Sequence, residues 1–258
     1  MRLWNLRGQQ NSISEALQLI LPEHAVVSFV GAGGKTSLIF AWARELAGEG
    51  KKVVVTTTTH MLHPVSAGDI YSGRAIIYDP GFKVDESEDF TEIDRLLENE
   101  RIVMLASKDV KNESKVTAPP GDILEYAYKA ADAVLIEADG SRQMPVKWPK
   151  EHEPVVPERT DLSICIAGLS AIGKPVSEVL YGAENMPDLL RRDTVDEAWI
   201  AMIVSHPDGG LKGTYGDYRI FLNQADNEEL QQSASDIQRL LAVRGMQSAW
   251  GSLKYRKN

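Results

Sequence analysis

The chain has 258 residues, enough for one large domain or two small ones. Hydrophobic residues make up 43% and charged residues 25%, as in ordinary globular proteins. The 28 basic side chains are outnumbered by 37 acidic ones, and the resulting net charge of −9 argues against nucleic-acid and anionic-membrane partners. The single cysteine cannot form an internal disulfide, and no segment has the apolar length of a signal peptide or a membrane span. We therefore expect a cytoplasmic protein.

The first predicted elements are a helix and a buried strand. Ser12 and Glu15 have the spacing of a capping box, and Pro22 follows soon after, which predicts a helix over Ser12–Ile20. Ala25–Val30 is a short apolar run typical of a buried strand, and a glycine-rich turn follows it at once.

A βαβ unit is expected from this strand onward. A helix through Ala47 follows the glycine-rich turn, Gly48 and Gly50 end that helix, and Lys52–Thr57 has the composition of the next strand. Strand, turn, helix and strand in about 33 residues predict a parallel pair of strands joined by a right-handed crossover.

The same alternation continues towards the C-terminus. Further short apolar runs typical of buried strands are Arg101–Ala106, Ala133–Glu137, Leu162–Ala167 and Tyr218–Asn223. Helical segments are expected at Asp122–Ala131 and Glu228–Val243. Because the strands are apolar along nearly their whole length, the sheet should be covered on both faces. The sequence predicts one α/β domain over residues 1–258, with a doubly wound, mostly parallel sheet and helices on both faces.

Two segments do not fit this alternation. Lys108–Gly121 is polar and ends in two prolines and a glycine, which predicts a loop or a mobile flap. Lys147–Pro157 holds three prolines in eleven residues and cannot be a regular helix or a central strand. This stiff segment either connects two parts of the fold or lines a ligand site through Lys147, His152 and Glu153.

The glycine-rich turn carries the clearest functional signal. It consists of Gly31, Ala32, Gly33, Gly34, Lys35, Thr36 and Ser37. Glycines let successive N–H groups approach an anion, and the helix that follows adds its positive end. Lys35 would contact the β and γ phosphates, and the Thr36 hydroxyl would bind Mg²⁺. Phe29 replaces the first glycine of the common G-x-x-x-x-G-K-[ST] pattern, so the shorter G-x-x-G-K-T resembles the compressed phosphate loop of Mur-type ligases. We expect binding of ATP or GTP with Mg²⁺.

Two carboxylates follow the predicted strand Ala133–Glu137. Ligands of an open parallel sheet bind beyond the carboxyl ends of its strands, where Glu137 or Asp139 could hold Mg²⁺ opposite the Thr36 hydroxyl. Arg142 could neutralise the charge that develops during phosphoryl transfer. An acidic turn without a role in binding is the alternative interpretation.

Hydroxyl and imidazole groups follow the strand Lys52–Thr57 at the same predicted edge. Thr58, Thr59 and His60 would overhang the phosphate site and contact phosphate, metal or substrate. An ordinary extension of the strand explains them equally well.

The sequence Asn223-Gln224-Ala225-Asp226 resembles the N-K-x-D element with which GTPases recognise guanine, with glutamine in place of lysine. Asn223 and Asp226 are therefore candidate residues at the base. A role for Asp226 as a helix N-cap is the alternative.

Several long segments together resemble the YqeC family, whose members are regarded as accessory proteins of selenium-dependent molybdenum hydroxylases. These segments are FVGAGGKTS, VVVTTTTHM, EADGSRQMPVKWPKEHEPVVP, GLSAIGKPV and LNQAD, and they extend from about Val27 to Asp226. The resemblance implies a P-loop nucleotide-binding fold of the NTPase type. It also implies a role in maturing or inserting a molybdenum cofactor, with a molybdenum hydroxylase or its cofactor-insertion machinery as partner.

The combined expectation is Mg²⁺-dependent binding of a nucleoside triphosphate with slow hydrolysis, with Lys35, Asp139 and Arg142 as the candidate catalytic residues. Two alternatives stay open. The first is an ATP-dependent ligase or kinase that acts on a small acid, as the Mur-like loop suggests. The second is a non-catalytic binding protein that uses the nucleotide as a conformational latch.

Overall fold

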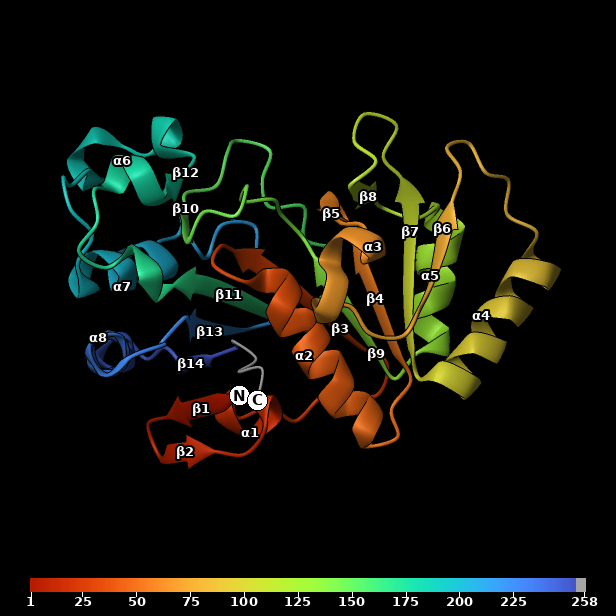
Figure 1. The fold of residues 1–258 in the computed structure, drawn as a ribbon, viewed down its shortest axis with the longest axis horizontal. Coiled ribbons are helices and arrows are strands. Elements are labelled where there is room, and N and C mark those ends of the chain that lie inside the picture. The colour runs from red at the N-terminus through yellow and green to blue at the C-terminus, as the bar shows by residue number, and fades with distance from the viewer. Residues whose placement is uncertain (254–258) are drawn as a thin grey trace.

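A single twelve-stranded sheet forms the centre of the computed structural model, which describes residues 1–253 (Figure 1). Its strands are β1 (Arg2–Asn5), β2 (Gly8–Gln10), β3 (Ala25–Gly31), β4 (Val53–Thr57), β5 (His60–Leu62), β6 (Arg74–Tyr78), β7 (Ile102–Lys108), β8 (Lys115–Thr117), β9 (Ala133–Glu137), β11 (Leu162–Gly168), β13 (Asp217–Asn223) and β14 (Ser248–Ser252). The strands β10 (Val146–Lys147) and β12 (Leu180–Tyr181) form a separate parallel pair. The helices are α1 (Ile13–Ala16), α2 (Lys35–Gly48), α3 (Pro64–Ala67), α4 (Glu86–Glu100), α5 (Gly121–Ala130), α6 (Val176–Val179), α7 (Glu197–Ser205) and α8 (Glu228–Val243).

The central strands of this sheet are all parallel. Their spatial order is β14, β13, β11, β3, β9, β4, β7 and β6. Antiparallel strands close both sides, β1 and β2 next to β14, and β8 and β5 next to β7. The chain continues from β3 to β4 on one side of β3 and later adds β11, β13 and β14 on the other. The carboxyl end of β3 is therefore the topological switch point, where ligands of such sheets bind.

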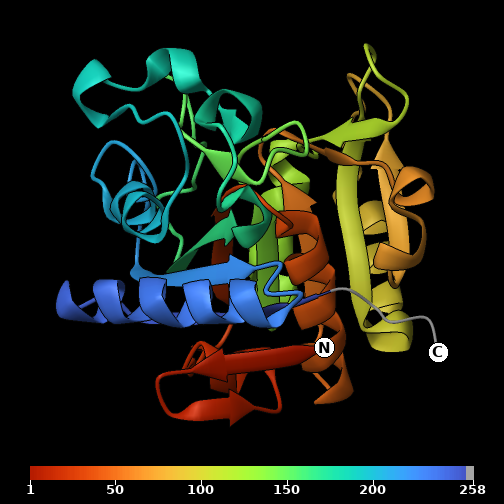
Figure 2. The same cartoon turned by 60° about the vertical axis from the view of Figure 1, so that its left-hand side comes forward.

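Helices cover both faces of the sheet, as the apolar strands predicted (Figures 1 and 2). Along β3, Val27 and Phe29 pack in the cluster that contains α2, whereas Val26 packs with α4 and α5 on the opposite face. Val30 belongs to a third cluster with α7 and α8. Figure 2 shows α8 running beside β13 and β14. The predicted fold class, a doubly wound and mostly parallel α/β sheet, is confirmed.

The first helix is shorter than the capping signal predicted. Ser12 does cap α1, since its Oγ accepts a hydrogen bond from the Glu15 N–H at 3.1 Å. The helix nevertheless ends at Ala16, because Gln18 adopts a φ of 54°, which right-handed helix cannot contain. The prediction of a helix as far as Ile20 is therefore wrong in length.

The segment Lys108–Gly121, predicted as a loop or flap, contains the strand β8. Val116 is fully buried in the α2 cluster, so this apolar side chain fixes the segment to the sheet. The strand pairs with both β7 and β5 in antiparallel register. The β7–β8 hairpin therefore stands beside the carboxyl edge of the sheet (Figure 1).

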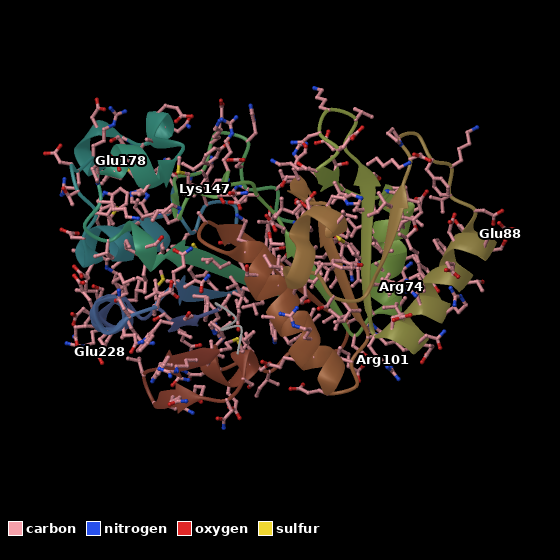
Figure 3. The ribbon with its side chains drawn as sticks, in the orientation of Figure 1. Arg74, Glu88, Arg101, Lys147, Glu178 and Glu228 are labelled. Atoms are coloured by element: carbon pink, nitrogen blue, oxygen red, sulfur yellow. The ribbon has the colours of Figure 1, made fainter. Side chains whose placement is uncertain are left out.

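Charged side chains gather on the outside, as Glu88 on α4 and Glu228 on α8 illustrate (Figure 3). Among the described residues, four charged ones are buried: Lys35, Glu137, Asp139 and Lys147. The first three come from the segments that the sequence assigned to the phosphate site, and Lys147 comes from the proline-rich segment. No helix in the described part of the chain is long and apolar enough to cross a membrane.

We expect Trp42→Ala to lower the free energy of unfolding by about 3–5 kcal/mol, because an indole is lost from a packed core. The Trp42 side chain is fully buried against Phe29, and its Nε1–H donates to Ser14 Oγ at 3.0 Å. Urea unfolding measures the change. Leu240→Ala, at a 40% exposed position of α8, should alter stability by less than about 0.5 kcal/mol. Equal shifts for the two variants would contradict this assignment of the core.

Candidate functional site

The glycine-rich turn joins the end of β3 to the start of α2 and needs its glycines. Gly31, Gly33 and Gly34 have φ values of 89°, 88° and 123°, which side-chain-bearing residues rarely adopt. A Cβ at Gly33 would lie 2.4 Å from the Gly168 nitrogen, and one at Gly34 would lie 2.3 Å from Asn223 Nδ2. The turn leads directly into the amino end of α2, a helix of fourteen residues. The unpaired N–H groups at that end favour an anion.

Lys35 is the first residue of α2, and its ammonium group turns back over the loop. Nζ donates to the Gly31 carbonyl at 2.6 Å and lies 3.0 Å from Asp139 Oδ1. Burial lowers the pKa of this ammonium, but the carboxylates of Asp139 and Glu137 outweigh burial and raise it overall. Lys35 therefore stays charged while it lines the cleft above the loop.

Thr36 and Glu137 form the second contact between the loop and the sheet edge. The Thr36 hydroxyl donates to Glu137 Oε2 at 2.7 Å. Burial raises the pKa of the Glu137 carboxyl, against the opposing effects of Lys35 and Thr36. A hydroxyl beside one carboxylate is a set of hard oxygen donors, and Mg²⁺ is usually held by one or two carboxylates together with substrate phosphates. The two residues therefore fit a magnesium position.

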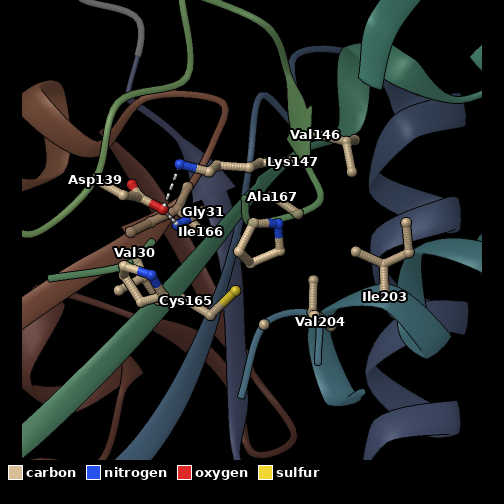
Figure 4. Close-up of a pocket in the computed structure, with 14 residues that line it drawn as sticks. Val30, Gly31, Asp139, Val146, Lys147, Cys165, Ile166, Ala167, Ile203 and Val204 are labelled. Atoms are coloured by element: carbon tan, nitrogen blue, oxygen red, sulfur yellow. Dashed lines mark hydrogen bonds and ion pairs between the residues drawn. The ribbon is translucent and has the colours of Figure 1, made fainter. Parts of the chain in front are cut away.

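Asp139 lies between two lysines rather than beside the Thr36 hydroxyl. Its Oδ2 accepts the Gly31 N–H at 3.0 Å and lies 3.1 Å from Lys147 Nζ, the two contacts drawn in Figure 4. Its Oδ1 faces Lys35. The carboxylate is 1% exposed, and both its oxygens are engaged by loop or lysine groups. Glu137 is therefore the better placed of the two candidate metal ligands.

Lys147 connects the proline-rich segment to this cluster. Its fully buried ammonium donates to the Gly140 carbonyl at 2.6 Å and lies 2.8 Å from Glu153 Oε2. The two-residue strand β10 fixes its backbone against Tyr181 of β12. The segment thus lines the site as well as connecting elements, since Glu153 borders the same cleft as the glycine loop.

An open cleft of about 740 Å³ lies over these residues, within the range of small-molecule sites. The glycine loop and Glu137 form its base. The loop after β9 and Tyr181 form one end. The other end is formed by β5, β8 and Ile70. A separate small internal cavity beside Asp139, Lys147 and Cys165 is shown in Figure 4.

The three residues predicted to overhang the site from β4 take different positions. Thr58 Oγ1 donates to the Val155 carbonyl at 2.6 Å, so this hydroxyl ties the proline-rich segment to the sheet edge. Thr59 and His60 line the cleft. His60 Nε2 lies 3.5 Å from Asp109 Oδ2.

Arg142 also lines the cleft, and its guanidinium lies 5.9 Å from the centre of the Tyr181 ring. No ion pair of Arg142 with a carboxylate occurs within residues 1–253, so its charge is available to a ligand. His152 is exposed and does not border the cleft.

Asn223 and Asp226 hold the loop and the sheet edge rather than facing the cleft together. Asn223 Nδ2 donates to the Gly33 carbonyl at 2.7 Å. Asp226 Oδ1 accepts the Ser252 hydroxyl at 2.6 Å. The alternative of an N-cap at Asp226 is wrong, because Asn227 caps α8 through its side chain.

Lys115 and Tyr181 are among the cleft residues that the sequence did not single out. Neither belongs to a local motif. Lys115 comes to the site through the pairing of β8 with β5, and Tyr181 through the pairing of β12 with β10. Only long-range strand pairing brings these two residues to the cleft, and local sequence patterns do not predict that pairing.

The comparisons with known proteins agree on one family. The family model described as "YqeC protein" matches residues 27–184. The Escherichia coli (strain K12) protein named "Uncharacterized protein YqeC" is 31% identical over 233 residues, which cover 87% of this chain and 86% of the relative. The match includes the glycine loop, both carboxylates after β9 and the proline-rich segment. On these grounds the chain belongs to the YqeC family.

Proposed function

We propose that this protein binds a nucleoside triphosphate with Mg²⁺, hydrolyses it slowly, and serves as an accessory protein in the maturation of selenium-dependent molybdenum hydroxylases. One observation carries the nucleotide site. The four buried charged residues of the described chain gather at the glycine loop, beneath an open cleft. Burying charge is costly without compensating partners, and strongly perturbed charges in a cleft are characteristic of functional sites.

The loop amides and Lys35 would hold the β and γ phosphates. Thr36 and Glu137 would hold Mg²⁺, which neutralises phosphate charge and polarises the transferred group. Arg142, which lines the cleft at its Tyr181 end, would stabilise charge on the phosphates.

Slow turnover is expected because neither carboxylate that borders the cleft is free to act as a base for the attacking water. Its two carboxylates within the described chain are Glu137 and Glu153. The first accepts the Thr36 hydroxyl, and the second is paired with Lys147. Catalysis would therefore depend on positioning and electrostatics.

Tyr181 supplies an aromatic ring for the nucleoside end of the ligand. It borders the cleft on the side of β10 and β12. Such a ring accepts either purine by stacking, so both ATP and GTP fit this proposal. A guanine-reading role of Asp226 would need its side chain to leave its hydrogen bond with Ser252.

The role in hydroxylase maturation is supported by membership of the family and by the length of the resemblance. A nucleotide-dependent accessory protein would act in the cytoplasm on a hydroxylase or on the machinery that inserts its cofactor. This part of the proposal can fail while the nucleotide site stands.

Replacing Lys35 by alanine should weaken nucleotide binding ten- to hundredfold, because it removes a charge-assisted contact of about 1.5–3 kcal/mol. Calorimetry with ATP and GTP, with and without Mg²⁺, measures the change, and thermal unfolding checks that the variant is folded. Lys51→Ala, an equal change of charge at an exposed position before β4, is the control. Unchanged affinity in folded Lys35→Ala would refute the site.

Glu137→Gln should abolish the Mg²⁺-dependent part of the nucleotide affinity without destabilising the free protein. The pKa of this carboxyl is raised above its usual 4.5, so its contribution to stability falls as pH rises through the raised pKa. Glutamine keeps an oxygen for the Thr36 hydroxyl and lacks the buried charge. Urea unfolding at pH 5 and pH 8 should show the variant gaining stability relative to the wild type at the higher pH. A Mg²⁺ effect of unchanged size in the variant would contradict the proposed ligand.

In cells that lack this protein, we expect molybdenum hydroxylase activity to return with the wild-type chain and not with Lys35→Ala. The physical reason is that the variant cannot use the nucleotide that drives its accessory role. Hydroxylase activity and molybdenum content of the purified enzyme are the measurements. Full activity without the protein would remove the maturation role and leave nucleotide binding unaffected.

A further inference from the structure

The cleft extends beyond the phosphate loop, to the hairpin strands β5 and β8. This far end is bordered by Thr59, His60, Leu62, Ile70 and Lys115. Figure 1 places β5 and β8 across the carboxyl end of β3 from β10 and β12. The far end is therefore separated from Tyr181 by the whole width of the loop.

A bound nucleotide would leave this end open. Thr36 and Glu137 mark the position of the metal, and Glu137 ends β9, which lies between β3 and β4. Mg²⁺ held by these two residues would neutralise the outer phosphates, and the terminal phosphate would then lie towards β4 and β5. The nucleoside would extend the other way, towards Tyr181.

Lys115 brings a cation to the open end. It is partly buried, and its ammonium makes no ion pair or hydrogen bond with any residue in the range 1–253. Its charge acts on Glu137, but that carboxylate already accepts the Thr36 hydroxyl and is the proposed metal ligand. A partly buried cation that no carboxylate engages is suited to an anionic ligand.

Thr59, Leu62 and Ile70 border the same space as Lys115. The Thr59 hydroxyl oxygen is inaccessible to solvent in the free protein and has no hydrogen-bond partner among the described residues. Leu62 lies directly opposite Lys115 in the β5–β8 register. Ile70 packs against the α2 cluster and borders the same space. The compartment thus offers a cation beside an apolar wall.

We propose that this compartment is a second ligand subsite, which takes a small organic anion, a carboxylate or phosphate ester with an apolar body, next to the terminal phosphate of the nucleotide. Lys115 binds the anionic group, and Leu62 and Ile70 contact the apolar body. This inference rests on the proposed nucleotide site. It assigns the subsite that a reaction of the nucleotide with a small acid would need.

Phenyl phosphate is a suitable probe, because it combines an anionic group with an apolar ring. Calorimetric titration into the protein saturated with Mg²⁺ and a non-hydrolysable triphosphate should detect a second binding event. Lys115→Gln should weaken that event about tenfold or more, since it removes one charge-assisted contact. Lys111→Gln, at an exposed lysine of the same hairpin, should leave it unchanged.

Nucleotide affinity separates failure of this inference from failure of the nucleotide site. Both variants should still bind the triphosphate, and Lys111→Gln should bind it as tightly as the wild type does. Absence of phenyl phosphate binding to the saturated protein would overturn the subsite and not the nucleotide site. Phenyl phosphate that binds only in competition with the triphosphate would also overturn the subsite. Equal weakening of phenyl phosphate binding in both variants would do the same. A protein that binds no triphosphate would overturn both.

Discussion

The site depends on one buried carboxylate, that of Asp139. It accepts the N–H of Gly31 and lies within 3.1 Å of the ammonium groups of Lys35 and Lys147. These partners come from the end of β3, the first turn of α2 and the short strand β10. Removing one partner of a buried ion pair leaves an uncompensated charge. Asp139 therefore fixes the glycine loop, the helix and the proline-rich segment relative to one another.

The register of two parallel strands explains why this carboxylate reaches the loop. Phe29 of β3 pairs with Glu137 of β9. Asp139 follows the end of β9 by two residues, and its Oδ2 accepts the N–H of Gly31, the last residue of β3. Glu137 borders the open cleft, whereas Asp139 borders the small cavity beside Cys165. Apolar packing on both faces of β3 and β9 therefore fixes the strand ends at which Glu137 and Asp139 lie.

Local patterns in the sequence predicted the central strands and the base of the site, because each signal lies within a few residues. Ala133–Glu137 has the bounds of β9 itself, and Lys35 and Thr36 lie where the glycine loop placed them. The sequence did not reveal the N-terminal hairpin, α4 or α7. The helix α4 buries only Ile93, Leu96 and Leu97 of its fifteen residues, so few apolar residues mark it in the sequence. Lys115 reaches the cleft only through non-local strand pairing, which no single segment encodes.

The balance of charge at the base of the cleft explains why a metal would be required. Two ammonium groups, those of Lys35 and Lys147, face three carboxylates, those of Asp139, Glu137 and Glu153. This set carries no net positive charge, so its carboxylates would offset part of the attraction that Lys35, Arg142 and the loop amides exert on a bare triphosphate. In the proposed site, Mg²⁺ held by Glu137 would reverse that sign where the outer phosphates would lie. Because Lys35 is also paired with Asp139, the metal would add to the attraction that this lysine and the loop amides offer the phosphates.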